Sequence, residues 1–399
     1  MRRAWGRRLV AIACGVLAAS CAAILGFPDR ELGDVGEAGP SPNEGGLESG
    51  AGDDSGGGDA AFDCGADSGL VACGAACVDP HASSANCGAC GHDCLGASCD
   101  AGACEPITLA TGLDTPVGIA VADDALYVAV NGANQLVSVE KLIGGTKTIT
   151  FSDNPSAPWG VVLEDAGAAG LRVIVGEERG GGNARVLRCD PKDCAATTDI
   201  AGNNDEHIHY FVIDGTTLFW TEANSSNTVM KCTLGNCNNT LATVSTVEEK
   251  NAWGLTEIGS TLYWTLENSD GGVRKLPAND VATQQNLAQG IATDGTRLFW
   301  ANNGGNEIRT CTPPACTATV FALSPSPAHV LVDDGIVYWS ENQTAGAIAW
   351  CPTSGCGTAP RILISGQKNA LWVAADKTAI YWTNSYSGGQ VMKIAKPAR

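Results

Sequence analysis

The chain repeats one pattern of apolar and polar positions from about residue 107 to its end. An apolar strand carrying paired aromatics gives way to a polar loop and a second apolar strand, as in "LFWTEANSSNTVMKCTLGNC" from Leu218. The pattern returns from Leu262, Leu298, Val337 and Ile380, and weaker copies begin at Leu126 and Leu171. Seven copies, 36 to 47 residues apart, are typical of β-propeller blades. We therefore predict an all-β chain that forms a seven-bladed propeller with four-stranded blades.

One copy shows the four strands expected in each blade. They are strand A at Gln289–Thr293, B at Arg297–Ala301, C at Glu307–Cys311 and D at Ala318–Leu323. Because successive side chains on a strand point to opposite faces, the Tyr or Phe and the Trp of each pair lie on opposite faces of the sheet. Each aromatic can therefore fill one of the two interfaces between neighbouring blades.

The two ends of the repeat region predict how the ring closes. The last copy supplies strands A (Ala370–Ala375), B (Thr378–Thr383) and C (Gln390–Ile394), and no residues remain for strand D. The segment "ITLATGLDTPVGIAV" before the first blade matches the passage from strand D to strand A in later copies. We expect Ile107–Thr111 to be the missing outer strand, because this pairing satisfies an otherwise open sheet edge.

The 18 cysteines fall into even groups once Cys14 and Cys21, in the N-terminal apolar region, are set aside. Four pairs have four residues between their members: Cys189/Cys194, Cys232/Cys237, Cys311/Cys316 and Cys351/Cys356. Eight more crowd into one short segment: Cys64, Cys73, Cys77, Cys87, Cys90, Cys94, Cys99 and Cys104. Even, clustered cysteines in an exported chain indicate disulfides. The segment has too few apolar residues to build a core, so cross-links replace one, with a pairing that the sequence leaves open.

A second interpretation of this Cys-rich segment is a metal site. In "CGACGHDC", Cys87, Cys90, Cys94 and His92 are soft ligands with zinc-like spacing. The segment also resembles the Cys-rich lead-ins of exported lipoproteins of myxobacterial type, a resemblance that implies no activity.

The N-terminus predicts export. Four arginines precede an apolar run from Leu9 to Leu25, as in a secretory signal. The sequence Leu17-Ala18-Ala19-Ser20-Cys21 resembles the bacterial lipobox, which implies diacylglycerol on Cys21 and attachment to the cell envelope. Ala22, where Asp would imply inner-membrane retention in lipoprotein families, favours the outer membrane. Ordinary signal cleavage and an uncleaved anchor helix are the alternatives.

Composition divides the rest of the chain. Residues 29–61 carry nine acids and no aromatic residue, so we expect them to be disordered. The predicted divisions are a signal peptide at 1–20, an acidic Gly-rich tether at 21–61, the Cys-rich module at 62–105 and the propeller at 106–399. The formal charge of −19 argues against a nucleic-acid partner, because phosphates would be repelled.

The repeats between residues 218 and 394 contain "LYWT", "LFWT" and "IYWT" and so resemble the YWTD propellers of the low-density lipoprotein receptor family. That resemblance implies a protein-binding ectodomain without catalysis. The chain departs from the family in having seven copies where the family has six blades. The family's Asp is replaced by Glu222, Leu266, Asn302, Glu341 and Asn384.

Aligned strands A place aromatic and polar residues near one end of the channel, where the D-to-A and B-to-C loops meet. The residues predicted to bind a ligand there are Trp159, His209, Tyr210, Trp253, Gln289, His329 and Trp372. The rim is predicted from the B-to-C loops: Glu177, Glu178, Glu222, Asn224, Glu267, Asp270, Asn302, Asn303, Glu341 and Asn384. Aromatic faces with a polar rim suit a sugar or a peptide. The alternative is that these aromatics plug the channel.

The preferred functional interpretation is a surface-anchored monomeric lipoprotein that binds a protein or glycan without catalysis, cofactor or metal. The sequence has no Ser-His-Asp pattern, phosphate loop or HExxH. His207, His209 and His329 with nearby acids leave open a metal-dependent hydrolase or lyase of gluconolactonase-like type. A purely structural envelope component is the third possibility, so the question of enzymatic activity stays open.

Overall fold

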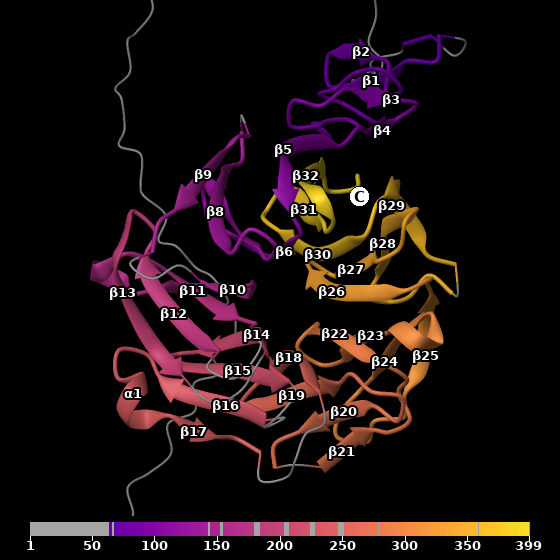
Figure 1. The fold of residues 1–399 in the computed structure, drawn as a ribbon. Coiled ribbons are helices and arrows are strands. Elements are labelled where there is room, and N and C mark those ends of the chain that lie inside the picture. The colour runs from indigo at the N-terminus through magenta and orange to yellow at the C-terminus, as the bar shows by residue number, and fades with distance from the viewer. Residues whose placement is uncertain are drawn as a thin grey trace, which may run out of the picture. The chain divides into compact units, whose positions relative to one another are not determined.

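Seven four-stranded antiparallel sheets form a ring around a common centre, with strand A of each sheet innermost (Figure 1). The computed structural model describes residues 64–65, 68–142, 144–151, 155–178, 184–202, 207–223, 228–245, 251–277, 279–357 and 359–398. The predicted signal peptide, Cys21 and the tether lie outside these residues. In the part of the chain that is described, no helix is long and apolar enough to cross a bilayer.

Each blade is written below in the order A, B, C, D. Blade 1 contains β6 (Pro116–Val121), β7 (Ala125–Val130), β8 (Gln135–Glu140) and β9 (Thr146–Ile149). Blade 2 contains β10 (Pro158–Asp165), β11 (Leu171–Glu177), β12 (Arg185–Asp190) and β13 (Asp193–Gly202). Blade 3 contains β14 (His207–Asp214), β15 (Thr217–Ala223), β16 (Thr228–Thr233) and β17 (Ala242–Thr243). Blade 4 contains β18 (Ala252–Ile258), β19 (Thr261–Leu266), β20 (Gly272–Lys275) and β21 (Asn279–Ala282).

The later blades follow the same order. Blade 5 contains β22 (Ala288–Thr293), β23 (Leu298–Asn302), β24 (Glu307–Cys311) and β25 (Thr319–Leu323), each within one residue of its predicted bounds. Blade 6 contains β26 (Pro327–Asp333), β27 (Ile336–Glu341), β28 (Gly346–Pro352) and β29 (Arg361–Gln367). Blade 7 contains β30 (Ala370–Ala375), β31 (Ala379–Asn384), β32 (Ser387–Ala395) and β5 (Ile107–Asp114). Short helices occur at Gly167–Ala169, Cys237–Thr240 (α1) and Asn303–Gly305.

The predicted closure of the ring is confirmed. Strand β5, from the start of the propeller, pairs antiparallel with β32, with Ile107 opposite Lys393 and Ala110 opposite Val391. The outer edge of β32 is therefore hydrogen-bonded, and the first and last parts of the propeller are held in one sheet.

The paired aromatics of strand B fill the blade interfaces as predicted. Tyr338 packs in a cluster with Trp382 and Ile348, whereas Trp339 packs in a different cluster with Phe299 and Val330. Both side chains are fully buried. Because consecutive residues pack in opposite interfaces, each aromatic pair contacts both neighbouring blades.

All four predicted C-to-D disulfides are present: Cys189–Cys194, Cys232–Cys237, Cys311–Cys316 and Cys351–Cys356. Each joins strand C to the segment that follows it, which is a strand at Cys194, helix α1 at Cys237 and a loop at Cys316 and Cys356. Bridges over such short loops restrict local fraying more than they restrict the whole unfolded chain.

The Cys-rich module contains two short hairpins, β1 (Val71–Cys73) with β2 (Ala76–Val78) and β3 (Cys99–Asp100) with β4 (Ala103–Cys104). Its eight cysteines pair as Cys64–Cys77, Cys73–Cys90, Cys87–Cys99 and Cys94–Cys104. The zinc interpretation of this module is therefore wrong, because the sulfurs of Cys87, Cys90 and Cys94 are in disulfides and not thiolates.

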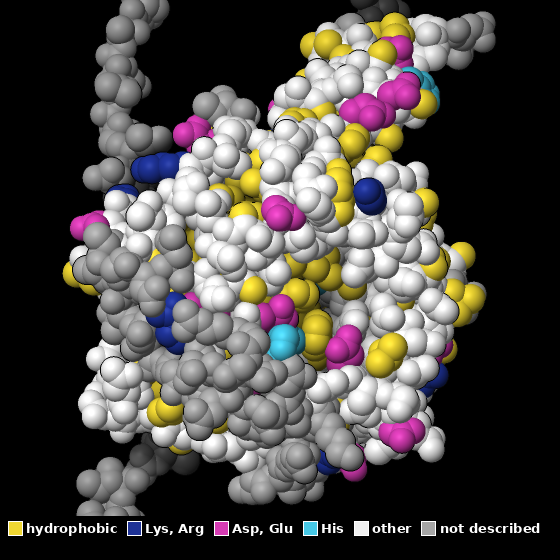
Figure 2. Space-filling view, viewed as in Figure 1, with side chains coloured by type: hydrophobic (Ala, Val, Ile, Leu, Met, Phe, Trp, Pro, Cys, Tyr) yellow, Lys and Arg dark blue, Asp and Glu magenta, His cyan; other side chains and the backbone are white. Residues whose placement is uncertain are grey.

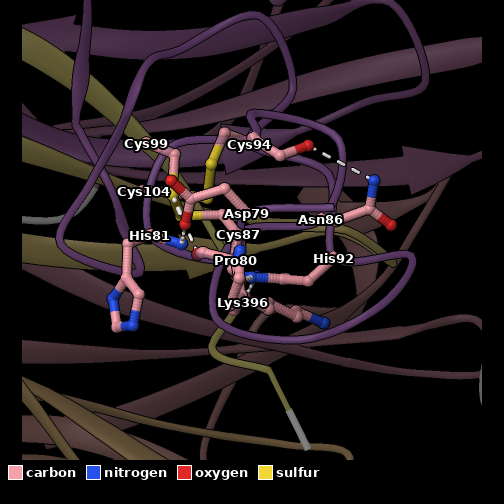
Figure 3. The surroundings of a disulfide bond; sticks show 11 residues. Asp79, Pro80, His81, Asn86, Cys87, His92, Cys94, Cys99, Cys104 and Lys396 are labelled. Carbon is pink, nitrogen blue, oxygen red and sulfur yellow. Dashed lines mark hydrogen bonds between the residues drawn. A yellow bond between two sulfur atoms is a disulfide. The ribbon is translucent and has the colours of Figure 1, made fainter. Parts of the chain in front are cut away.

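The module packs on the last blade. Buried Cys87, Cys94 and Cys104 belong to the same hydrophobic cluster as Met392 and Ile394 of β32. His92, which the zinc interpretation used as a ligand, instead places its two ring nitrogens on the carbonyl oxygens of Cys87 and Lys396, the latter at 2.7 Å (Figure 3). The imidazole therefore links the module to the end of the propeller chain.

Candidate functional site

A β-bulge begins strand A in all seven blades. In blade 2, Pro158 pairs with Glu177 and pairing resumes only at Val161 with Val175, so two residues oppose one on strand B. The two bulged residues of each blade are the two columns aligned from sequence: Val117/Gly118, Trp159/Gly160, His209/Tyr210, Trp253/Gly254, Gln289/Gly290, Ala328/His329 and Leu371/Trp372. Since a bulge re-aims side chains, it explains how adjacent residues both serve the channel. The sequence alignment found the columns and missed the bulge.

The hydroxyl that follows the strand-B Trp joins neighbouring blades at these bulges. In blade 4, Thr265 Oγ1 accepts the Gly254 N–H at 2.8 Å and donates to the Gln289 carbonyl of blade 5 at 2.5 Å. Equivalent bonds run from Thr221, Ser340 and Thr383. A Cβ on Gly254 would lie 2.5 Å from that same Gln289 carbonyl, so the close approach requires glycine there. The Thr of the "YWT" phrase therefore has a structural role.

The predicted site residues form two aromatic groups. The His209 cluster consists of Trp159, His209 and Trp253, with the His209 ring centroid 5.3 Å from Trp159 and 4.0 Å from Trp253. His209 is buried, while the two tryptophans are half-buried. Figure 2 shows hydrophobic, acidic and histidine side chains meeting in the hollow at the centre of the ring.

The Tyr210 cluster consists of Tyr210, His329 and Trp372. Tyr210 stacks on Trp372 at 4.6 Å, and the His329 and Trp372 rings lie 4.5 Å apart. Tyr210 and Trp372 are each 8 % exposed and belong to one hydrophobic cluster with Leu255 and Trp264. Burial lowers the pKa of His329 to about 3, so its imidazole is neutral. The three rings of this cluster pack on one another, and the half-buried Trp159 and Trp253 of the His209 cluster are more exposed than Tyr210 and Trp372.

A third column completes the mouth of the channel. It consists of the third residue after the strand-B Trp position: Asn131, Glu178, Ala223, Glu267, Asn303, Asn342 and Ser385. In the six blades where both residues are described, its N–H donates to the carbonyl of the residue just before strand A, as Glu178 does to Ala157 at 2.9 Å. Glu178 and Glu267 are the acids of this column, and each contacts a bulged residue of the next blade.

Glu178 of blade 2 contacts both histidines of blade 3. Its Oε1 lies 2.8 Å from His209 Nε2 and 3.0 Å from His207 Nδ1. Burial alone would raise the pKa of Glu178, but the hydrogen bonds from His207 and His209 outweigh it and hold that pKa at about 2. Desolvation lowers the pKa of His209 despite the carboxylate beside it. At neutral pH the pair is therefore an anionic carboxylate beside a neutral imidazole.

These three residues fit a divalent metal ion. Their ligand atoms lie within 4.8 Å of one another. A tetrahedral ion with bonds of about 2.1 Å needs ligand atoms roughly 3.4 Å apart, so the observed contacts would open by about half an ångström. Two imidazoles and one carboxylate are a common catalytic zinc set, and the half-buried His207 and Glu178 give access from solvent. Asn131 Nδ2 lies 3.4 Å from the second carboxylate oxygen and helps to orient it.

Glu267 of blade 4 makes the matching contact with blade 5. Its Oε1 accepts the Nε2–H of Gln289 at 2.6 Å. Burial raises the pKa of this carboxyl, and the bond from Gln289 offsets only part of the effect. The sequence placed Gln289 in the site, and the structure joins it to Glu267 rather than to the histidines.

Three buried polar atoms of the predicted site residues have no hydrogen-bond partner among the described residues. They are Trp159 Nε1, His209 Nδ1 and His329 Nδ1. Buried donors and acceptors are ordinarily paired, because an unpaired one costs about 1–3 kcal/mol. Buried tryptophans of strand B, such as Trp264 and Trp300, carry unpaired indole nitrogens as well, so these atoms alone do not distinguish a ligand site from the packed interior.

Several acids predicted for the rim are buried structural residues instead. Glu177 forms a bidentate pair with Arg185, and Glu222 accepts the indole N–H of Trp220 at 2.8 Å. Glu341 accepts from Ser324, while Asn302 and Asn384 are also buried. These residues lie two positions after the strand-B Trp position, at the end of strand B and still within the sheet. Their side chains are therefore buried between blades. Predicted Asn224 lies outside the described residues.

A cleft of about 940 Å³ lies between the module and blades 1, 2 and 7, away from the bulges. It is lined by turn residues such as Asp124 and Asp376 and by Lys141 and Lys393. Lys141 pairs with Asp376 at 2.5 Å, and Tyr381 donates to the same carboxylate at 2.8 Å. Two of its charges, Lys141 and Asp376, are therefore paired with each other, and we place the candidate site at the channel mouth, where Glu178, His207 and His209 converge.

Comparison with known proteins supports the fold. By sequence, the chain matches no protein-family model and no curated protein. A streptogramin B lyase structure superposes with a TM-score of 0.58 at 14% identity, over 73% of this chain and 97% of that chain. A gluconolactonase from Xanthomonas campestris superposes with a TM-score of 0.49 at 13% identity, over 76% of this chain and 91% of that chain. A computationally designed protein superposes with a TM-score of 0.49 at 8% identity, over 72% of this chain and 98% of that chain. The structural neighbours thus include enzymes, and at these identities the likeness shows the propeller fold alone.

Proposed function

We propose that the protein is a metal-dependent hydrolase or lyase whose active site is the mouth of the propeller channel. The observation that carries this proposal is the convergence of Glu178, His207 and His209 from two neighbouring blades. Three protein ligands leave a further position open for water or substrate, which is the arrangement of catalytic rather than structural zinc sites.

A bound divalent ion would polarise a substrate carbonyl and lower the pKa of a bound water. The protein's own groups supply the rest. The Trp159 indole N–H has no partner among the described residues and can donate to a substrate oxygen. Half-buried Trp159 and Trp253 both pack against His209 and offer apolar faces beside the ligand set. Neutral His209 keeps the site free of an extra positive charge.

Metal content tests the proposal directly. The full chain, produced with its disulfides, is incubated with Zn²⁺, desalted and analysed for metal. We expect one ion per chain, and loss of that ion in Glu178→Ala and His209→Ala. His81→Ala is the matched control, because His81 is exposed in the Cys-rich module. A metal-free wild-type protein, or equal zinc in His209→Ala, would contradict the proposed function.

Non-catalytic binding of a glycan or protein is the second candidate function. The half-buried pair Trp159 and Trp253 favours it, since aromatic faces at the mouth suit sugar rings and peptide side chains. Glycan arrays and pull-downs with Trp159→Ala and Trp253→Ala test it. Binding that needs both tryptophans and persists in metal-free protein would favour this candidate.

We also propose that the chain is exported and anchored to the outer membrane through Cys21. Eight disulfides among the described residues support an oxidising compartment. Metabolic labelling with palmitate is expected to mark the wild-type chain and not Cys21→Ser. Equal labelling of both proteins would contradict lipid attachment at this residue.

A further inference from the structure

We propose that Lys393 is a nucleophilic amine that reacts with an aldehyde to form an imine in the cleft of about 940 Å³ beside blades 1, 2 and 7. This would be a second site, independent of the function proposed for the channel mouth. The cleft has the volume of an ordinary small-molecule site. The inference begins from Lys393 because it is a buried lysine that lines this cleft.

The repeat has a lysine at one strand-C position in three of its blades. The lysines at this position are Lys231 opposite Phe219, Lys275 opposite Tyr263 and Lys393 opposite Tyr381. Lys231 is exposed and Lys275 is half-buried, whereas Lys393 is only 4 % exposed. Lysine is almost never fully buried unless it is paired with an opposite charge. The burial of Lys393 is therefore not required by the repeat and needs its own explanation.

The Lys393 ammonium makes no ion pair with any of the described residues. Its one recorded hydrogen bond is donated to the Lys141 carbonyl oxygen at 3.3 Å, which is longer than the usual N–H···O distance. The half-buried lysines nearby differ, because Lys141 pairs with Asp376 and Lys396 pairs with Asp333. Within the described part of the chain, two of the three N–H groups of a charged Lys393 therefore have no acceptor.

The surroundings of Lys393 favour its neutral form. Burial is the largest influence and lowers the pKa of this amine, and the Lys141 ammonium lowers it further. Asp376 and Asp93 of the Cys-rich module act in the opposite direction without overcoming burial. The Asp376 carboxylate is already bonded to Lys141, to the Tyr381 hydroxyl at 2.8 Å and to two backbone N–H groups. A neutral amine has the lone pair that a nucleophile requires, and an ammonium does not.

The composition of the cleft favours an uncharged electrophile. Burial beside a second cationic group is a common way to activate a lysine toward carbonyl compounds. The lining carries acids as well as lysines, among them Asp93, Asp124 and Glu140, so it offers an anionic reactant little net attraction. Leu95 and Tyr127 supply apolar surface in the same lining. An aldehyde with a short apolar chain fits both properties.

The reaction is a condensation that releases water. The Lys393 nitrogen forms a bond to the carbonyl carbon, and one of its protons moves to the carbonyl oxygen, which gives a carbinolamine. That oxygen then takes a proton from solvent, and the carbon–oxygen bond breaks with its electron pair going to the oxygen. The nitrogen forms the double bond to carbon and returns its remaining proton to solvent. Amine and aldehyde thus become imine and water without an oxidant or a reductant.

Reductive trapping tests whether Lys393 reacts in this way. The full-length, disulfide-bonded protein is incubated at neutral pH with a limiting amount of butyraldehyde and with sodium cyanoborohydride, which reduces an imine to a stable secondary amine. Peptide mapping by mass spectrometry then gives the rate at each lysine. We expect buried Lys393 to carry the butyl group before exposed Lys231, its counterpart in blade 3. Burial without activation would give the reverse order.

The variant Lys141→Gln tests the activation without changing Lys393 itself. It removes the neighbouring ammonium and releases the Asp376 carboxylate, so Lys393 should keep its proton and react about tenfold more slowly. If exposure alone governed the rate, the shorter glutamine would open the cleft and speed the reaction. Lys192→Gln is the matched control, because Lys192 lines the same cleft and is exposed. It should leave the rate at Lys393 unchanged.

Two results would overturn the proposal. One is labelling of Lys231 before Lys393 in the wild-type protein. The other is an unchanged or faster reaction of Lys393 in Lys141→Gln, with a melting temperature that shows the variant is folded. Early labelling of Lys393 together with its slowing in Lys141→Gln would support an activated amine in this cleft.

Discussion

Two sets of aromatic residues in this propeller differ in how regularly they recur and in how uniformly they are buried. The strand-B set recurs at one position in five blades, and its tryptophans Trp220, Trp264, Trp300, Trp339 and Trp382 are all 0 % exposed. The strand-A set occurs in only some blades, and its burial varies: Trp159 and Trp253 are half-buried, whereas Tyr210 and Trp372 are each 8 % exposed. The presence of an aromatic residue therefore does not by itself indicate packing between blades. Its recurrence at one strand position in blade after blade does.

The physical reason lies in the ring. Every blade presents the same interface to its neighbours, so packing demands the same large side chain in blade after blade. A ligand contacts the ring from one side and needs different groups from different blades. Glu178 and His209 break the repeat, and in the proposed function they bind the ligand.

Replacing one tryptophan of each set gives the largest predicted difference. Trp339→Ala should lower the free energy of unfolding by about 3–5 kcal/mol, because it removes a fully buried side chain and its bond to Ser324 at 2.8 Å. Trp253→Ala should cost roughly 1 kcal/mol or less. Denaturant unfolding measures the loss of unfolding free energy in each variant. Equal losses would contradict the predicted difference between the two sets of aromatics.

The repeated disulfides should contribute less than the repeated tryptophans. Converting Cys351 and Cys356 to serine opens a bridge with a sequence separation of 5. A loop of this size gives a loss of about 2 kcal/mol by the loop-entropy relation. The melting temperature of the double variant should fall while zinc binding at the mouth persists. Loss of zinc binding would show that the bridge also positions the site.

The hydroxyl links between blades should have a smaller effect again. Thr383→Val removes the donor to the Val117 carbonyl and the acceptor for Trp372 N–H, at the junction of blades 7 and 1. The expected loss is about 1–2 kcal/mol, since two backbone groups lose their partner. Thr108→Val, on the exposed face of β5 in the same sheet, is the control and should be nearly neutral. Equal stability of the two variants would argue against a structural role for the hydroxyl.

Unfolding free energy measured over a series of pH values extends the comparison to His329, a residue that does not recur from blade to blade. His329 has a folded pKa of about 3, below its ordinary value of 6.5, so the unfolded state binds the proton first. The stability that neutral His329 contributes is complete above about pH 6.5 and is lost as pH falls toward 3. His329→Phe should therefore show a shallower fall in unfolding free energy over this interval. Parallel curves for the two proteins would contradict the assignment of a neutral buried imidazole.

Local repetition explains how much of this fold the sequence predicts. The seven blades, the closure by Ile107–Thr111 and the four short disulfides follow from spacing along the chain and are confirmed. The pairing of the eight module cysteines was left open, because their separations of 10 to 17 residues allow many connections.

The contacts in the candidate site depend on how neighbouring blades are aligned with each other. The spacing of the repeats along the sequence does not determine that alignment. Sequence alignment named His209 and Gln289 but set Glu178 and Glu267 among ten rim residues without partners. It also set buried Glu222 and Glu341 on the rim, because it took the position after the "YWT" phrase as loop. Reading the third residue after each strand-B Trp position across the repeat would have separated Glu178 and Glu267 from those buried acids.

Anomalous diffraction from zinc-soaked crystals of the protein tests the central claim most directly. The account predicts one strong peak at the channel mouth, about 2.0–2.2 Å from an Oε of Glu178, Nδ1 of His207 and Nε2 of His209. A mouth without a peak while Glu178 keeps its hydrogen bonds to both histidines would contradict it.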